Sequence, residues 1–338
     1  MRNLPKRLCV LAAALAALAL VGAAHAQQDT WAGVERIVAV GDVHGDYGQF
    51  VKALRAAEVI DEKDNWAAGK THLVQVGDVL DRGPDSRKAM DLLMKLEGQA
   101  AKAGGAVHAL IGNHEAMVLL DDWRYVHPGE LKAFGGAEEE YRKAMSAQGE
   151  YGKWIRTHNT VIKINGLLFV HAGIPPSCAR LSLAQINKAI REELQKGDTE
   201  GLAMSFSSPL WDRTLTLGDE DEAAKQLDAV LKKYDARRLV VGHTVSPKGI
   251  LTAAGGRLIR IDVGMCEYYG GPAACLVVEK GIFYEVTHPK TKRKLELEAP
   301  ATQPAPTLRS PATKYTATRK RTQLLRRLSP HSRREGRI

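Results

Sequence analysis

Five short apolar runs in this 338-residue chain each end beside a glycine and a residue that commonly binds metals. The segments that follow the runs are Gly41-Asp42-Val43-His44-Gly45, Gly77-Asp78-Val79-Leu80-Asp81-Arg82-Gly83, Gly112-Asn113-His114-Glu115, His171-Ala172-Gly173 and Gly242-His243-Thr244. In α/β proteins, sites form just beyond the carboxyl ends of the strands, and glycine lets the chain leave a strand in a sharp turn. The pattern therefore predicts strand ends that bring several metal ligands to one place.

Between residues 30 and 290 the whole chain alternates between short apolar runs, which include these five, and longer amphipathic stretches. The apolar runs predict strands at 36–40, 72–76, 106–111, 167–170, 238–241 and 258–261. Apolar residues at spacings of three and four predict helices at 47–58, 86–103 and 183–196. Such alternation favours an α/β core. The charged stretches 118–160 and 177–236 are predicted to be helical insertions over that core.

The five segments together offer six donors for metal ions. They are Asp42, His44, Asp78, Asn113, His171 and His243. Three imidazoles, two carboxylates and an amide oxygen suit zinc, iron or manganese better than calcium or magnesium. Six donors are too many for one tetrahedral zinc, but they fit two ions about 3.5–4 Å apart that share a carboxylate. The predicted cofactor is therefore a pair of transition-metal ions (Mn, Fe or Zn).

On these residues the sequence resembles the calcineurin-like metallophosphoesterase superfamily and, within it, the phosphoprotein phosphatases. The shared pattern is GDxHG, GDxxDRG, GNHE, a later His-x-Gly and a final histidine, over roughly residues 35–265. The segments Pro209–Arg213, Ile261–Met265 and Tyr269–Gly271 resemble those of Shewanella-like protein phosphatases. Bacterial diadenosine tetraphosphatases are the near alternative, but they tend to have other residues where this chain has Asp81 and Glu115.

The resemblance implies an α/β (α+β) fold, the metallophosphoesterase-type four-layer sandwich, in which helices flank two mixed β-sheets. It also implies how the metal ligands divide. One ion would be held by Asp42, His44 and Asp78, and the other by Asp78, Asn113, His171 and His243.

The resemblance gives four further residues catalytic roles. His114 would be the general acid, oriented by Asp81, and the guanidinium groups of Arg82 and Arg213 would hold the phosphate. Asn113 and His114 are neighbours in the chain, so their side chains are expected to diverge and take different roles. Asp262 receives no role.

The implied function is a phosphomonoesterase in which a metal-bridging hydroxide attacks the phosphate ester directly. The substrate would be a phosphorylated protein or a small phosphoester, and a symmetrical dinucleoside tetraphosphatase is the alternative. A degraded phosphatase that only binds is disfavoured because no ligand is missing. A nuclease or phosphodiesterase is disfavoured because the last segment reads GHTV and not GHxH.

The first 26 residues have the layout of a secretory signal peptide. A basic start is followed by an apolar run from Leu8 to Ala24 and by the cleavage pattern Ala24-His25-Ala26. An uncleaved anchor is the alternative, because this run has the length of a short membrane-spanning helix. We expect cleavage, export to the periplasm or beyond, and no transmembrane span in the mature chain.

The net charge of +9 lies at the two ends of the chain. Residues 1–26 carry three basic and no acidic residues, and residues 299–338 carry ten basic residues and one acidic residue, which leaves a net −3 for residues 27–298. The basic balance is therefore no argument for a nucleic-acid partner, and we expect none that is stable. Residues 27–298 are predicted to form the catalytic domain, and 299–338 a disordered tail. That tail either has no role or contacts anionic surfaces.

Three cysteines follow the predicted signal peptide, namely Cys178, Cys266 and Cys275. Export permits disulfides, and Cys266 with Cys275 could close a short loop. Buried free thiols are the other interpretation, and the sequence leaves both open.

Overall fold

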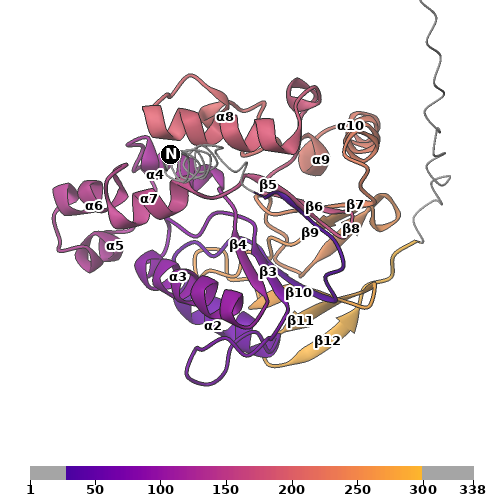
Figure 1. Cartoon of the computed structure of the whole chain (residues 1–338), viewed down its shortest axis with the longest axis horizontal. Helices are drawn as coiled ribbons and strands as arrows, with labels where there is room; N and C mark the ends of the chain where they lie inside the picture. The colour runs from indigo at the N-terminus through magenta and orange to yellow at the C-terminus, as the bar shows by residue number, and fades with distance from the viewer. Residues whose placement is uncertain (1–27, 299–338) are drawn as a thin grey trace, which may run out of the picture. The chain divides into compact units, whose positions relative to one another are not determined.

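The computed structural model describes residues 28–298, which form two six-stranded β-sheets with helices packed against them (Figure 1). The predicted signal peptide and the predicted basic tail fall outside these residues, so both stay predictions. No helix within the described range is long and apolar enough to cross a membrane.

The first sheet is mixed: β6, β7 and β9 are parallel, β5 is antiparallel to β6 but parallel to β1, and β8 is antiparallel to β9. Its strands, in spatial order, are β1 (Thr30–Trp31), β5 (Val161–Ile164), β6 (Leu167–Val170), β7 (Arg238–Val241), β9 (Leu258–Arg260) and β8 (Leu251–Ala253).

The second sheet is also mixed, because β2, β3 and β4 are parallel whereas β10 runs antiparallel to β2. Its strands, in spatial order, are β12 (Thr291–Lys294), β11 (Ile282–Thr287), β10 (Ala274–Glu279), β2 (Arg36–Val40), β3 (His72–Gln75) and β4 (Ala106–Ala109). The predicted fold, two mixed sheets flanked by helices, is confirmed.

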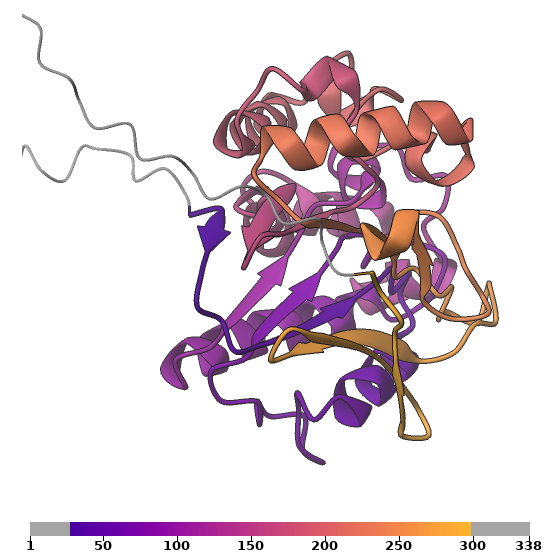
Figure 2. The ribbon, with the colours of Figure 1, turned by 90° about the vertical axis from the view of Figure 1, so that its right-hand side faces the viewer.

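Helices contact both sheets. Helices α2 (Tyr47–Ala56) and α3 (Ser86–Lys102) pack against the second sheet, and α8 (Leu183–Lys196) and α10 (Glu220–Lys233) against the first (Figures 1 and 2). The other helices are α4 (Asn113–Leu119), α5 (Pro128–Ala133), α6 (Glu138–Met145), α7 (Glu150–Arg156) and the short α9 (Thr214–Leu217). The two predicted insertions are therefore helical, with α5, α6 and α7 in the first and α8, α9 and α10 in the second.

Burial explains why these segments form these elements. Strand β6 reads Leu-Leu-Phe-Val and is buried on both faces, as expected for a strand covered by a sheet on one side and helices on the other. Each fully buried side chain such as Phe169 contributes about 1.5–3 kcal/mol. Ser182 caps the start of helix α8, because its hydroxyl accepts from the backbone N–H of Gln185. Gly197 caps the end of the helix in the left-handed conformation (φ 71°).

The six strands and three helices predicted from the sequence are all present, with ends that differ by no more than two residues. Six further strands were not predicted, namely β1, β5, β8, β10, β11 and β12. Cys178, Cys266 and Cys275 are buried free thiols, so the structure supports the second interpretation of the cysteines.

Candidate metal centre

The six predicted metal ligands lie in loops that leave the carboxyl ends of five parallel strands, β2, β3 and β4 in one sheet and β6 and β7 in the other. All six side chains are buried and lie close together: Asp42 and His44 after β2, Asp78 after β3, Asn113 after β4, His171 after β6 and His243 after β7. The edges of the two sheets therefore form one site, as the sequence pattern predicted.

Asp78 is at the centre of this site. Its Oδ2 lies 3.7 Å from Nε2 of His44 and 3.3 Å from Nε2 of His171. Ligands about 2.0–2.2 Å from a shared ion lie roughly 3–4 Å from each other, which these separations match. Since His44 and His171 come from different sheets, one carboxylate faces ligands of both expected ions.

The ligands expected to hold the second ion converge tightly. Nε2 of His171 lies 2.9 Å from Oδ1 of Asn113 and 3.1 Å from Nδ1 of His243. Nε2 of His243 is buried and has no hydrogen-bond partner among the described residues. A cation placed among Nε2 of His171, Oδ1 of Asn113 and Nδ1 of His243 would be bound by these three atoms, whereas Nε2 of His243 is on the other side of its ring.

Hydrogen bonds to backbone carbonyls orient two of the imidazoles. Nδ1 of His44 faces the carbonyl oxygen of Leu80 at 3.0 Å, and Nδ1 of His171 faces that of Val76 at 3.0 Å. When Nδ1 donates to a carbonyl, the proton sits there and leaves the Nε2 lone pair free for a metal ion. In both rings it is Nε2 that points at Asp78.

The electrostatics of the site also favour cations. Burial lowers the pKa of His44 to about 3 and that of His243 to about 2, so both rings are neutral and able to bind metal. Burial, together with the charges of Asp262 and Asp78, raises the pKa of Asp42 well above its usual value. Crowded buried carboxylates beside neutral imidazoles fit a pair of transition-metal ions.

Between residues 28 and 298, two groups of side chains each bring one ligand atom per residue within 4.8 Å of one another. The first is made of His44, Asp78 and His114, and the second of Asp78, His171 and His243. Asp42 completes the first group, because its Oδ2 is 4.0 Å from Nε2 of His44. Both oxygens of Asp42 also accept from the backbone N–H of His243, at 3.1 and 3.2 Å.

The backbone is held in an unfavourable conformation at several of these positions. The backbone angle φ lies between 47° and 72° at five positions, a region that residues other than glycine rarely adopt. They are His44, Asp78, Asp81, Arg82 and His243. Such strain persists only where surrounding structure enforces it, and it is concentrated at functional sites. The sharp turns therefore fall on the ligands themselves as well as on glycines.

Two of the neighbouring glycines are required by close approach. A Cβ at Gly112 would lie 2.3 Å from Oδ1 of Asp78, and one at Gly242 would lie 2.4 Å from Oδ1 of Asp42. Any larger residue would push a carboxylate out of the site.

The side chains of Asn113 and His114 diverge, as expected for neighbours at the start of a helix. Nδ1 of His114 is 2.5 Å from Oδ2 of Asp81, which is completely buried, while Nε2 faces Asp78 at 3.9 Å. Burial by itself would lower the pKa of His114, but Asp78 and Asp81 outweigh it and raise that pKa. His114 is therefore placed to hold a proton beside the metal ligands.

Glu115 is a functional residue that sequence reasoning missed. Its carboxylate accepts from the backbone N–H groups of Asp78 (2.7 Å), Val79 (2.8 Å), Leu80 (3.3 Å) and Gly112 (2.7 Å). It thus ties together the two loops that follow β3 and β4. Its position as the third residue of a helix that begins after glycine could have indicated such a role.

The two predicted phosphate-binding arginines have different neighbours, because Arg213 contacts His243 and Thr244, whereas Arg82 lies among tyrosine rings. Arg213 donates from Nη1 to the carbonyl oxygen of His243 and to Oγ1 of Thr244, each at 3.0 Å. Nε of Arg82 is buried and has no hydrogen-bond partner in the described range. Guanidinium groups suit phosphate oxygens because they offer paired donors.

Aromatic side chains lie near His44, His114, His243 and Arg82, and the sequence analysis gave them no role. We call them the aromatic border: Tyr125, Phe206, Trp211, Tyr268 and Tyr269. The guanidinium carbon of Arg82 lies 4.7–5.4 Å from three of these rings. The ring of Tyr125 lies 5.2 Å from that of His114, and the ring of Trp211 lies 6.4 Å from that of His243.

The fold and the ligands together define a metallophosphoesterase. A family model for the calcineurin-like phosphoesterases matches residues 35–247, and the chain belongs to this family. It is therefore a metal-dependent phosphatase, as the resemblance implied.

Similar proteins include Shewanella-like protein phosphatase 1 of Plasmodium berghei, which is 33% identical over 70% of this chain and 69% of its own length. An uncharacterised protein of Schizosaccharomyces pombe is 36% identical over 72% of this chain and 77% of its own. Among solved structures, a cold-active protein-tyrosine phosphatase of a Shewanella species superimposes with a TM-score of 0.73 at 31% identity, over 81% of this chain and 85% of that one.

Proposed function

We propose that this protein is an exported phosphatase whose preferred substrates are proteins phosphorylated on tyrosine. The aromatic border is the observation that carries the proposal. Tyr125, Phe206 and Tyr268 are exposed by 40%, 80% and 68% although they are large and apolar. Exposed aromatic residues cost free energy in water and are typical of binding sites. Here Tyr125 contacts His114, Tyr268 contacts Arg82, and Phe206 packs on Trp211.

The border suits a flat aromatic leaving group better than an aliphatic one. Aromatic rings pack edge-to-face or offset at 4.5–7 Å and contribute about 0.5–1.5 kcal/mol per pair beyond the area that they bury. A phosphotyrosine whose phosphate meets Arg82 would place its ring among Tyr125, Tyr268 and Tyr269. The similar phosphatase from Shewanella is itself described as a protein-tyrosine phosphatase.

The protein's own groups have distinct tasks in the proposed reaction. Two ions held by the six ligands would lower the pKa of a coordinated water to about 7 and neutralise phosphate oxygens. Arg82 and Arg213 bind the remaining phosphate oxygens from two sides and fix the ester for in-line attack. His114 donates its proton to the departing phenolate or alkoxide, and Asp81 orients the imidazole and stabilises its charge.

The identity of the ions and the location of the protein are also part of this proposal. The ligand set accepts manganese, iron or zinc, and occupancy follows supply. Export rests on the signal-peptide layout of residues 1–26. The basic segment 299–338 is proposed to contact anionic surfaces.

A panel of substrates tests the proposal with protein reconstituted separately with Mn, Fe and Zn. We expect kcat/KM for a phosphotyrosine peptide to exceed that for the matched phosphoserine peptide by about tenfold or more, since two or three ring contacts are gained. Faster hydrolysis of a dinucleoside tetraphosphate would favour the alternative function, and faster hydrolysis of bis-p-nitrophenyl phosphate would favour a phosphodiesterase.

A substitution in the border separates its role from general folding. Tyr268→Ala is expected to reduce the preference for the phosphotyrosine peptide, mainly through KM, and to leave the phosphoserine peptide almost unaffected. Ile282→Ala, at another exposed apolar side chain outside the border, is the matched control. Equal effects of Tyr268→Ala on both peptides would contradict the proposed role of the ring.

A further inference from the structure

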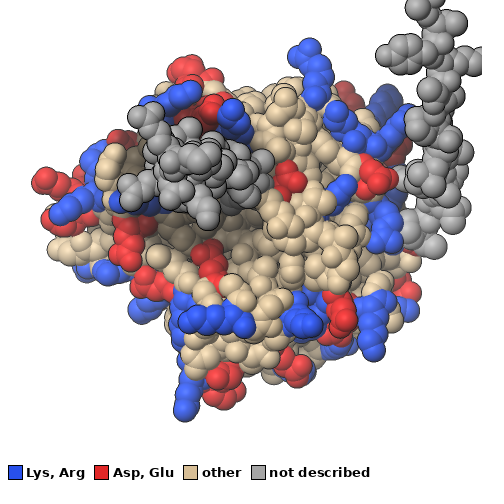
Figure 3. Space-filling model, viewed as in Figure 1, with Lys and Arg blue, Asp and Glu red and all other residues tan. Residues whose placement is uncertain are grey.

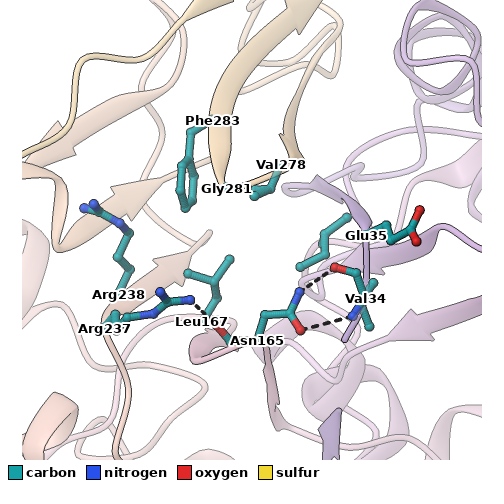
Figure 4. Close-up of a pocket in the computed structure, with 10 residues that line it drawn as sticks. Val34, Glu35, Asn165, Leu167, Arg237, Arg238, Val278, Gly281 and Phe283 are labelled. Carbon is teal, nitrogen blue, oxygen red and sulfur yellow. Dashed lines mark hydrogen bonds between the residues drawn. The ribbon is translucent and has the colours of Figure 1, made fainter. Parts of the chain in front are cut away.

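A cavity separate from the metal centre lies between the two sheets, at the end of the strands opposite to the metal ligands (Figure 4). Its volume is about 430 Å³, within the range of small-molecule sites. Polar and apolar side chains both line it, with Arg237 and Arg238 on one side and Glu35 on the other (Figure 4). The residues that line it are Val34, Glu35, Ile37, Asn165, Leu167, Arg237, Arg238, Val278, Gly281 and Phe283.

Two consecutive arginines give this cavity its charge. Arg238 is 5% exposed and donates to the carbonyl oxygens of Gly256 (2.6 Å) and Glu298 (2.7 Å). Arg237 is exposed and donates to the carbonyl oxygen of Asn165 at 2.7 Å. Within residues 28–298 neither guanidinium forms a salt bridge with a carboxylate.

A buried cation without a counter-charge is unfavourable. Burial, together with the neighbouring charge of Arg237, lowers the pKa of Arg238. The carboxylate of Glu35 points away from Arg237 in the close-up (Figure 4) and does not neutralise it. Arg238 is stabilised by two carbonyl oxygens and by the ring of Phe283, whose centroid is 5.2 Å from its guanidinium carbon. The charge at this cavity that lacks a carboxylate partner in the described range is therefore that of Arg237.

The apolar walls define the rest of the ligand. Ile37, Leu167, Val278 and Phe283 are buried and come from four different strands. They leave a space that would bury a hydrocarbon or aryl body, with the anion at the arginines. The segment 299–338 begins next to Glu298, but its net charge of +9 argues against it as the occupant.

The cavity is joined to the metal ligands by three strands. Strand β2 runs from Ile37 to the loop of Asp42, β6 runs from Leu167 to His171, and β7 runs from Arg238 to the loop of His243. At about 3.3 Å per residue, each strand spans roughly 15 Å between the two sites. A ligand that shifts the starts of these strands would shift ligands of both expected ions.

We propose that this cavity binds small amphipathic carboxylates and that the bound ligand alters turnover at the metal centre through β2, β6 and β7. The second part rests on the phosphatase activity, whereas binding does not. Calorimetry and kinetics therefore distinguish a failure of one part from a failure of the other.

The binding test uses decanoate as the probe and calorimetry on the metal-loaded protein. Arg237→Gln is expected to weaken binding about tenfold or more, since a charge-assisted hydrogen bond is lost. Val34→Trp, which fills the cavity from a half-buried position, is expected to abolish binding. Lys188→Gln, which also removes one positive charge but lies on α8, is the matched control and should bind like the wild type.

Three results would overturn the binding site. They are an absence of decanoate binding, equal affinity of the wild type and Arg237→Gln, and equal affinity for decanol, which would mean that the site is merely apolar. Tighter binding after deletion of residues 300–338 would identify the tail as the occupant and refute an external ligand.

The kinetic test follows hydrolysis of p-nitrophenyl phosphate with and without saturating decanoate. We expect kcat to change by at least about twofold in the wild type and in Lys188→Gln, and to stay constant in Val34→Trp. Acetate at the same concentration can meet metal ions but cannot fill the cavity, so it should have no effect. Decanoate that binds without changing kcat or KM would refute the effector role.

Discussion

Replacing Asp81 by asparagine tests the proposed proton donation by His114. Asp81 is completely buried, and its Oδ2 lies 2.5 Å from Nδ1 of His114. Asparagine keeps the size and can still accept from Nδ1 through its amide oxygen, but it carries no charge. The substitution therefore changes the strength of one hydrogen bond while the imidazole stays in place.

The structure sets the size of the effect. A hydrogen bond that involves a charged group contributes about 1.5–3 kcal/mol, and ionised partners roughly double the strength of such a bond. Removing the charge of Asp81 while the protonated ring keeps its own should therefore lose about 1.3 kcal/mol of stabilisation of that ring. That loss corresponds to about tenfold in rate when proton donation limits turnover. His114→Asn, which removes the acid, should lose about 10²–10⁴-fold.

The assay compares two esters that differ in their need for a proton. Phenyl phosphate releases a basic phenolate and should show the full loss in kcat, whereas p-nitrophenyl phosphate releases a stable anion and should lose much less. The protonated ring is the active form, and Asp81 raises its pKa. The alkaline fall in kcat on phenyl phosphate should therefore move to lower pH in Asp81→Asn.

Equal losses on the two esters would refute proton donation by His114. Metal content measured by mass spectrometry is the control. If His114→Asn loses metal, then His114 is a ligand, in line with its place beside His44 and Asp78 in one of the two donor groups.

Three further predictions concern Asp78, Glu130 and the segment 300–338. Asp78→Asn should lose both ions and nearly all turnover, because Asp78 faces ligands from both sheets; retention of two ions by elemental analysis would contradict its bridging position. Burial raises the pKa of Glu130 to about 8 from 4.5. Its contribution to the free energy of unfolding is therefore complete below about pH 4.5 and is lost as the pH rises through 8. Urea unfolding of Glu130→Gln against the wild type should therefore show a difference that grows by about 1.4 kcal/mol per pH unit in that window, and a constant difference would contradict the raised pKa. Deletion of residues 300–338 should leave kcat for p-nitrophenyl phosphate within about twofold, and a larger loss would place the tail at the site.

The sequence alone was sufficient to predict the strands that carry the metal ligands. Strands such as β6 and β7 are buried along their whole length, so they read as continuous apolar runs. Strand β12 is Thr-Lys-Arg-Lys and exposed throughout, so its sequence has no apolar pattern that would predict a strand. It is a strand because it pairs with β11. An edge strand of this kind is determined by its neighbour in the sheet and not by its own residues.

The site was predictable in its ligands but not in the contacts that support them. The six ligand residues and His114 follow glycine-marked turns, which are visible in the sequence. Glu115 acts on backbone N–H groups 35–37 residues away, and backbone groups leave no trace in the sequence. The cluster of Arg82, Tyr125 and Tyr268 likewise joins three distant loops, so only the fold reveals it.

The carboxylate of Glu115 has a consequence for how the protein acquires its ions. By binding four backbone N–H groups of two loops, it fixes the course of the chain around Asp78 and Asn113 without help from any cation. Chelation should therefore empty the centre while the sheets stay folded, and one transition metal could then be exchanged for another without refolding. A chain matured where manganese is abundant and one matured where iron is abundant would share a fold and differ only in the ions that they carry.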